Sequence, residues 1–331
     1  MTDASSTQTT RVAPPVVGAS VDLGSNSVHL LVAGIQEHRL DPLVDESVFL
    51  GLGKSVDSTG HLGPVARAGL VEALVHYAEI ARELGAERIT FIGTEPIRRA
   101  ADGATIAADV ERATGVPLYV LTHEEEAYLT VVGVTAGRPV EDETLIVDVG
   151  GGSSEFCVVG PTERPRATGL KLGSNRLTTR HVTSDPPTRR EVEAMIAEAV
   201  ALLQDAPDAH PTEIVAVGGT ASNLLKIVPE ARIDMVLTRA RIAQAMDILE
   251  GETADEAVER HLVKPIRARI LPAGAAIMDA LMTRYGVSRI RVSDAGIREG
   301  AILVADHVGA GWRDRLPDLA HGWRTQERSS R

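Results

Sequence analysis

The chain has 331 residues, of which 44% are hydrophobic, and this is enough to build the cores of two domains of ordinary size. Its net charge of −12 and its 3% of aromatic residues argue against a nucleic-acid partner, because such proteins rely on basic surfaces and on aromatic side chains that stack with bases. Neither a run of about 18 apolar residues nor a secretory leader is evident, so we expect a cytoplasmic protein without membrane contact.

The two ends of the chain and its single cysteine are expected to carry little chemistry. Residues 1–15 are mostly polar and predict a disordered N-terminal tail, and residues 311–331 are assigned to a C-terminal tail. Cys157 stands in the apolar run FCVV, which predicts a buried core residue rather than a nucleophile.

Apolar runs alternate with helical stretches in the first half of the chain. The pattern predicts a hairpin at residues 20–34, a helix near 63–84 that ends at Gly85, a strand at 88–94, a helix near 104–114, a strand at 117–122 and a helix at about 124–137. Thr122 and Glu125 have the spacing of a capping box for the last of these helices.

The second half repeats the same alternation. It predicts strands at 144–151 and 154–160, a helix at 189–203 with a capping box formed by Thr188 and Glu191, a strand at 213–220, a mainly helical region at 238–285, a strand at 289–296 and a helix from Ile297. The whole pattern predicts an α/β protein of two units, residues 16–137 and 138–310. Whether the last helix packs back on the first unit is left open.

Two hairpins share an unusual tip. In VDLGSNSVHLLVAG and LIVDVGGGSSEFCVVG, an apolar strand ends in Asp-x-Gly, turns through small residues and leaves as a second strand. Glycine lets successive N–H groups point at one anion, and the aspartates, Asp22 and Asp148, suit a metal ion or a water molecule on a phosphate. One such hairpin is ordinary turn chemistry, but the pair favours two tips that face each other across a phosphate-binding cleft.

A third glycine-rich element follows a later strand. In IVAVGGTASNLL, Gly219 and Thr220 lead into a helix whose N-terminus could bind an anion. Proteins of the α/β class also use such turns only for packing, so this element alone is weak evidence.

These motifs resemble the phosphate and adenosine motifs of the actin, hexokinase and heat-shock ATPase superfamily. More specifically, the ordered stretches VDLGSNSVHLLVA, GTEPIRRA, EEEAYL, IVDVGGGSSEF and SDAGIREG are similar to those of the exopolyphosphatase and guanosine pentaphosphate phosphohydrolase family, over residues 17–308. The resemblance implies two actin-like (ribonuclease H-like) α/β domains with the active site in the cleft between them. It also implies a short, two-domain form without the extra C-terminal helical domains of longer members.

The resemblance assigns chemical roles to individual residues. Glu126 matches the family's catalytic base, and the capping box explains Glu125 and the acidic first turn without needing Glu126. Arg98 matches a phosphate-binding arginine, which can hold phosphate through two N–H groups. Asp148 and Glu155 match acidic positions that bind Mg²⁺ (or Mn²⁺) or steer the attacking water, and Asp22 is expected to share that role.

Further residues are expected around the phosphates. The predicted cradle consists of Gly24, Ser25, Asn26, Ser27, Gly150, Gly151, Gly152, Ser153, Gly219 and Thr220. Arg267, Arg298 and Glu299 are additional candidates, although Arg298 and Glu299 could equally form an ion pair between the domains.

Two residues depart from the family pattern. Glu95 adds a negative charge that would repel substrate unless it is turned away or binds metal, and Arg269 replaces an expected acidic residue. With Lys171, Arg176 and Arg180, Arg269 could guide a polyanion, but a solvated basic face is the preferred interpretation.

The resemblance implies a Mg²⁺-dependent hydrolase that removes the terminal phosphate of inorganic polyphosphate as orthophosphate. The alternative within the family is removal of the 5′ phosphate of guanosine pentaphosphate, a nucleotide of the stringent response. Two other classes remain open: an ATP-dependent small-molecule kinase, and a non-catalytic polyphosphate or nucleotide sensor. A homodimer is also left open.

Overall fold

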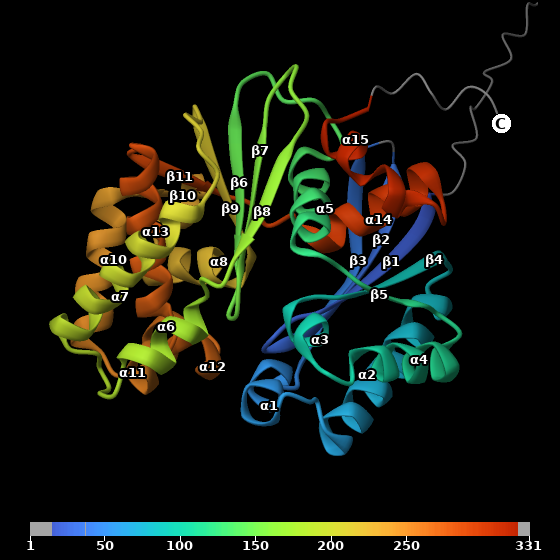
Figure 1. The fold of residues 1–331 in the computed structure, drawn as a ribbon, viewed down its shortest axis with the longest axis horizontal. Coiled ribbons are helices and arrows are strands. Elements are labelled where there is room, and N and C mark those ends of the chain that lie inside the picture. Colours follow the sequence, from blue (N-terminus) through green and yellow to red (C-terminus); the bar gives the residue numbers. More distant parts are fainter. Residues whose placement is uncertain (1–14, 37, 324–331) are drawn as a thin grey trace, which may run out of the picture.

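The structure is a computed structural model that describes residues 15–36 and 38–323. The predicted N-terminal tail lies outside the described residues except for Pro15, as do residues 324–331 of the predicted C-terminal tail. Two sheets flanked by helices make up the molecule, so the predicted α/β class with two units is confirmed (Figure 1). No helix in the described part of the chain is long and apolar enough to cross a membrane.

The first sheet has five strands in the order β3-β2-β1-β4-β5. Its strands are β1 Val16–Leu23, β2 Ser27–Gln36, β3 Arg39–Phe49, β4 Ala86–Gly93 and β5 Leu118–Val120. The helices of this half are α1 Leu52–Thr59, α2 Pro64–Glu83, α3 Glu95–Arg99, α4 Gly103–Thr114 and α5 His123–Thr135. The hairpin predicted at residues 20–34 is thus confirmed as the antiparallel pair β1 and β2.

The second sheet has six strands in the order β10-β11-β9-β6-β7-β8. Its strands are β6 Thr144–Val149, β7 Ser154–Val159, β8 Arg166–Leu170, β9 Glu213–Val217, β10 Val236–Thr238 and β11 Arg289–Val292. The run β8-β7-β6-β9 has the same order and pairing directions as β3-β2-β1-β4, because β6 is antiparallel to β7 and parallel to β9. The duplication inferred from the two hairpins is therefore present in the fold.

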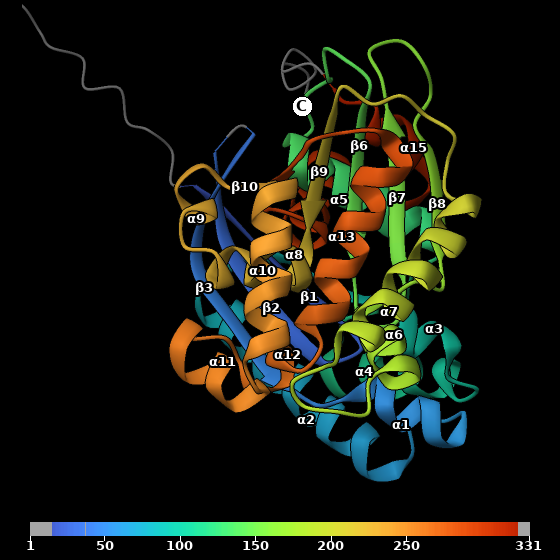
Figure 2. The same ribbon diagram turned by 90° about the vertical axis from the view of Figure 1, so that its left-hand side faces the viewer.

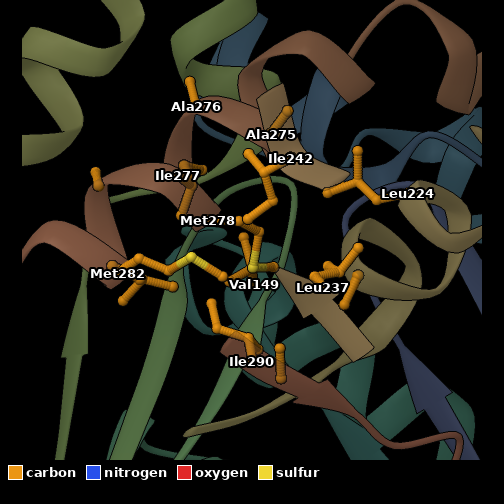
Figure 3. Packing of buried hydrophobic residues seen from close by; sticks show 14 of the residues in the cluster. Val149, Leu224, Leu237, Ile242, Ala275, Ala276, Ile277, Met278, Met282 and Ile290 are labelled. Atoms are coloured by element: carbon orange, nitrogen blue, oxygen red, sulfur yellow. The ribbon is translucent and has the colours of Figure 1, made fainter. Parts of the chain in front are cut away.

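The helices of the second half are mostly on the outer face of this sheet, where α7, α10 and α13 pack (Figure 2). They are α6 Ser174–His181, α7 Arg189–Leu202, α8 Gly218–Ile227, α9 Ala231–Asp234, α10 Arg239–Gly251, α11 Ala254–His261, α12 Pro265–Ala268, α13 Leu271–Tyr285 and α14 Ile297–Val308. A 3-10 turn at Leu203–Asp205 follows α7. Figure 3 shows Met278 and Met282 of α13 in the buried cluster that also contains Leu237 and Ile290 of the sheet.

The inner faces of the sheets are covered by two helices that lie side by side, α5 and α14 (Figure 1). Helix α5 ends the first half but packs on β7 and β8 of the second sheet, whereas α14 ends the second half but packs on β1 and β4 of the first. The two helices can approach closely because Gly133 and Gly300 have no side chains. A Cβ on Gly133 would collide with the carbonyl oxygen of Gly296, and a Cβ on Gly300 would collide with the carbonyl oxygen of Leu129. Cys157 is fully buried in the core between the sheets, as predicted.

Several short or exposed elements were not predicted. Strand β3 contains Pro42 and has mostly exposed or half-buried side chains, because it forms an edge of the first sheet and needs no apolar run. Residues 311–323 hold a 3-10 turn at Trp312–Arg315 and helix α15 at Leu316–Ala320. The Trp312 side chain is buried there beside Tyr119, and α15 packs on α5.

Candidate active site

A cleft of about 710 Å³ lies between the two units and is lined by residues of both. It brings together most of the predicted site residues, which are Asp22, Gly24, Ser25, Asn26, Ser27, Glu126, Asp148, Gly150, Gly151, Gly152, Ser153, Glu155, Gly219, Arg267, Arg298 and Glu299. Of the predicted residues, all of which are described, Arg98 and Thr220 are not among those lining the cleft.

The two hairpin tips have the same internal construction. Asp22 pairs with His29 across β1 and β2, and Asp148 pairs with Glu155 across β6 and β7. The Gly24 N–H donates to the Ser27 carbonyl at 3.1 Å, and the Gly150 N–H donates to the Ser153 carbonyl at 3.0 Å. These two N–H groups close their own turns, which differs from the predicted donation to phosphate.

The second tip directs its other N–H groups away from helix α6. The carbonyl oxygens of Gly150 and Gly151 accept from the N–H groups of Ser174 and Asn175 at the start of α6, each at 3.0 Å, and that of Gly152 accepts from Arg176 Nε at 2.5 Å. In a trans peptide, the N–H of the following residue points the opposite way. The N–H groups of residues 151–153 therefore point away from α6, and all three residues line the cleft.

The first tip is held in the same manner by the chain that enters α1. The Ser25 carbonyl accepts from the Gly53 N–H at 2.8 Å, and the Asn26 carbonyl accepts from the Gly51 N–H at 2.9 Å. The first tip also contacts the second unit directly, because Asn175 Nδ2 at the start of α6 donates to Asn26 Oδ1 at 2.9 Å. The structure thus brings both glycine-rich tips to one site, as the paired hairpins predicted.

Buried carboxylates gather at the base of this site. Burial raises the pKa of Asp22 to about 7, and repulsion by Glu155 adds to the shift while Arg298 opposes it. Burial likewise raises the pKa of Asp148 to about 7, with further contributions from Glu155 and Asp22. The pKa of Glu126 lies well above its ordinary value, first because of burial and then because of Glu155, and Arg98 opposes this shift. A cation in the cleft would stabilise the ionised form of these carboxylates and so lower their pKa values.

The residues present fit a divalent cation that is held partly by its substrate. Within the described residues no three acidic, histidine or cysteine side chains form a ready-made metal site. Asp22, Asp148 and Glu155 nevertheless line one cleft, and Asp22 Oδ1 is buried without a hydrogen-bond partner. Mg²⁺ commonly binds one or two carboxylates together with substrate phosphates, and this donor set suits that mode. The absence of a side chain at Gly218 leaves room for the Asp148 carboxylate, because a Cβ there would lie 2.5 Å from Asp148 Oδ1.

Glu126 occupies the first turn of α5, where the local sequence fixes its direction. The predicted capping box is present, with Thr122 and Glu125 bonded reciprocally, so Glu125 faces the helix start and Glu126 lies one residue further around the helix. Only 5% of Glu126 is exposed, and its carboxylate accepts a hydrogen bond from Arg98 Nη1. The same Arg98 nitrogen donates to the Leu121 carbonyl at 2.6 Å. Arg98 therefore lies against Glu126 and is not among the described residues that line the cleft, and its role as a phosphate ligand stays a prediction.

Some residues in and beside the site were missed from the sequence, among them His29 and Lys264 in the cleft wall and His123 beside it. His123 Nδ1 lies 2.8 Å from Glu155 Oε1, and Arg98 Nη2 lies 3.0 Å from Nδ1 and 3.3 Å from Nε2. The only signal for His123 in the sequence was a histidine beside three glutamates, which we interpreted as a helix start.

Basic side chains occupy another wall of the cleft. Lys264 precedes α12, Arg267 lies within it, and Arg298 lies in the first turn of α14. Burial and these three cations lower the pKa of His29 to about 4. Burial is the larger cause of this shift, and the three cations add to it because they place positive charge on this wall, which favours an anionic ligand.

Three predicted candidates also have structural contacts. Arg298 Nη1 forms an ion pair with Asp45 of β3 at 2.6 Å, and the Glu299 side chain accepts from the Gly296 N–H at 2.7 Å and caps α14. Thr220 is buried with its Oγ1 unpartnered, and its methyl group packs against Gly274. Lys171, Arg176, Arg180 and Arg269 are all described but do not line the cleft, and Arg180 pairs with Glu198.

Glu95 is neither turned away from the cleft nor part of a described metal cluster. Its Oε1 accepts from Arg99 Nε at 2.8 Å and from Arg176 Nη2 at 2.9 Å, while Oε2 accepts from Ser25 Oγ at 3.1 Å. Arg99 and Arg176 neutralise the added charge, and because Arg176 belongs to α6 the contact ties the two units together beside Gly152.

Replacing Glu95 by alanine is expected to lower the free energy of unfolding by about 1–3 kcal/mol, because hydrogen bonds to charged groups contribute roughly this amount. Urea unfolding of Glu95→Ala, with the exposed Glu72→Ala on α2 as control, measures the effect. Equal stability of the two variants would show that Glu95 does not hold the units together.

Comparison with known proteins gives matches over most of the chain. Residues 31–307 match the sequence profile of the Ppx/GppA phosphatase family. Exopolyphosphatase 1 of Mycobacterium tuberculosis (strain ATCC 25618 / H37Rv) is 30% identical over 306 residues, which cover 86% of each chain. Exopolyphosphatase 2 of the same strain is 30% identical over 314 residues, 86% of this chain and 97% of the relative. The crystal structure of the Aquifex aeolicus Ppx/GppA family member is 28% identical, covers 88% of this chain and 97% of its own, and has a TM-score of 0.77.

Proposed function

Because the chain belongs to the Ppx/GppA phosphatase family, we propose that it hydrolyses the terminal phosphoanhydride of inorganic polyphosphate and releases orthophosphate. It is a hydrolase with two actin-like domains, in agreement with the fold class expected from the sequence. The observation that carries the proposal is the meeting of two glycine-rich tips beside the buried carboxylate of Glu126 in one cleft.

The chemistry follows from the placement of these groups. The outward N–H groups of the two tips and the basic wall hold the terminal phosphate and the phosphates behind it. Glu126 accepts a proton from the attacking water, and its raised pKa makes it a stronger base than an exposed glutamate. When bound by Asp22, Asp148 or Glu155, Mg²⁺ would supply positive charge to the phosphate oxygens as the bond breaks.

Polyphosphate is favoured over guanosine pentaphosphate by the composition of the cleft. Among the described residues that line it, there is no Phe, Tyr or Trp on which a guanine base could stack. The curated relatives matched here are named exopolyphosphatases, which agrees with this choice.

Guanosine pentaphosphate remains the second candidate substrate. A kinase would need a bound acceptor in place of water, and a sensor would bind without turnover. The cytoplasmic location and the homodimer stay predictions.

The proposal is tested by orthophosphate release with Mg²⁺ from short polyphosphate, long polyphosphate, guanosine pentaphosphate and ATP. Release from polyphosphate in preference to the nucleotides supports it. Preferential release from guanosine pentaphosphate would transfer the activity to the second candidate. Binding of polyphosphate without release would indicate a sensor.

Asp148→Asn is expected to raise the Mg²⁺ concentration needed for half-maximal activity at least about tenfold, because even indirect partners of metal ligands contribute that much. A Mg²⁺ titration of activity measures this change. The matched control is Asp247→Asn, an exposed aspartate on α10. An unchanged Mg²⁺ requirement would remove Asp148 from the proposed metal site.

A further inference from the structure

His123 links the two units beside the cleft, through a contact with the cleft-lining residue Glu155. It is the first residue of α5, after the N-cap Thr122, and its imidazole reaches Glu155 on β7 of the second sheet at 2.8 Å. The side chain of Glu155 is 5% exposed and that of His123 is 30% exposed. The contact therefore joins a side chain of the first unit, His123, to a buried carboxylate of the second unit, Glu155.

The hydrogen-bond polarity of this contact is determined by its partners. An ionised Glu155 only accepts hydrogen bonds, so His123 Nδ1 must carry the proton that it donates. Arg98 Nη2 lies 3.0 Å from Nδ1 and 3.3 Å from Nε2, so it packs against the imidazole ring at similar distances from both nitrogens. Arg98 in turn donates to Glu126. A connected series of side chains thus runs from Glu126 through Arg98 and His123 to Glu155.

Packing fixes the direction of the imidazole ring. The ring lies over Gly169 of β8, where a Cβ would collide with the ring and with His123 Cβ. The absence of a side chain at residue 169 therefore leaves the space that the imidazole fills. Because the ring is held from one side by β8 and from the other by Arg98, it separates Arg98 from Glu155.

The separation matters because Glu126 and Glu155 could both form an ion pair with Arg98. Glu126 and Glu155 repel each other, and Arg98 is the cation that lies on Glu126. If the imidazole were removed, Glu155 could turn onto Arg98 and draw it away from Glu126. The base would then lose the contact that orients it.

We propose that His123 is a positioning residue that holds Glu155 away from Arg98, so that Arg98 stays on Glu126 and Glu155 stays directed along the cleft wall. This inference rests on the proposed hydrolysis and adds to it a residue through which the two domains set the geometry of the base. His123 is not among the described residues that line the cleft. It acts through Arg98 and Glu155.

The test compares three variants of the full chain. His123→Ala removes the ring, His123→Asn retains an N–H donor near the place of Nδ1, and His76→Ala changes an exposed histidine on α2. We expect His123→Ala to lower kcat for polyphosphate about 10- to 100-fold with KM changed less than about threefold. His123→Asn should recover most of the lost kcat, and His76→Ala should equal the wild type.

Crystal structures of the two His123 variants give a readout that does not need turnover. We expect Glu155 to lie against Arg98 in His123→Ala and to keep its wild-type position in His123→Asn. Wild-type kcat in His123→Ala, or a Glu155 that does not move there, overturns the proposal. A wild type that is silent on polyphosphate rejects the proposed substrate instead, and the positions of Glu155 and Arg98 in the variants still decide the role of His123.

Discussion

Replacing Glu126 by glutamine is expected to lower kcat by about 10² to 10⁴, because a positioned general base typically contributes this much. KM for polyphosphate should change little, since the tips and the basic wall that hold the phosphates are untouched. The amide of glutamine has nearly the shape of the carboxylate, and its oxygen can still accept from Arg98. The loss is therefore one of proton acceptance rather than of packing.

Single-turnover and steady-state release of orthophosphate measure this effect, and calorimetry with a non-hydrolysed polyanion measures binding. Glu124→Gln is the matched control, because Glu124 is exposed in the same helical turn and is not among the cleft-lining residues. If Glu126→Gln retained the wild-type rate, another group would have to accept the proton, and the assignment of the base would fail.

Arg98→Ala is expected to have the second large effect, and its pH dependence identifies the role of Arg98. The arginine opposes the rise in the pKa of Glu126, so its removal raises that pKa further. The base acts in its ionised form, so activity falls as pH falls through this pKa. The acid limb of the rate profile should then move to higher pH by about one to three units, the usual effect of one neighbouring charge. At neutral pH the rate should fall by at least about tenfold, with partial recovery in alkali.

The pH–rate profiles of wild type, Arg98→Ala and Arg98→Lys distinguish this role from the phosphate-binding role expected from the sequence. A phosphate ligand would raise KM at every pH and leave the acid limb in place. Arg98→Lys keeps a positive charge beside Glu126 and should leave the limb near its wild-type position, although lysine cannot donate to Glu126 and to the Leu121 carbonyl in the same forked geometry.

Local sequence signals predicted the elements that position the site. Asp-x-Gly followed by small residues specified both hairpins, and the spacing of Thr122 and Glu125 specified where α5 begins and therefore where Glu126 points. These features depend on neighbours within a few residues. The duplication of one pattern then sufficed to predict two facing tips.

Contacts between distant segments could not be predicted in this way. Glu95 depends on Arg176, which is 81 residues away, and His123 depends on Glu155 and on the empty space over Gly169. Each partner is unremarkable in its own segment, and the pairing appears only when the units are packed together. Strand β3 was missed for a different reason, because an exposed edge strand is stabilised by backbone hydrogen bonds and leaves no apolar pattern.

The crossing of α5 and α14 has a consequence for folding. Each sheet receives its inner layer from the helix that the other half supplies, so neither half contains all the apolar surface that must cover its own sheet. An isolated half would leave Ile92 or Ile146, both fully buried here, facing water. The two halves therefore form one cooperative folding unit, although their strands repeat one pattern, and helix α14, near the end of the second half, must be synthesised before the first sheet can be completed.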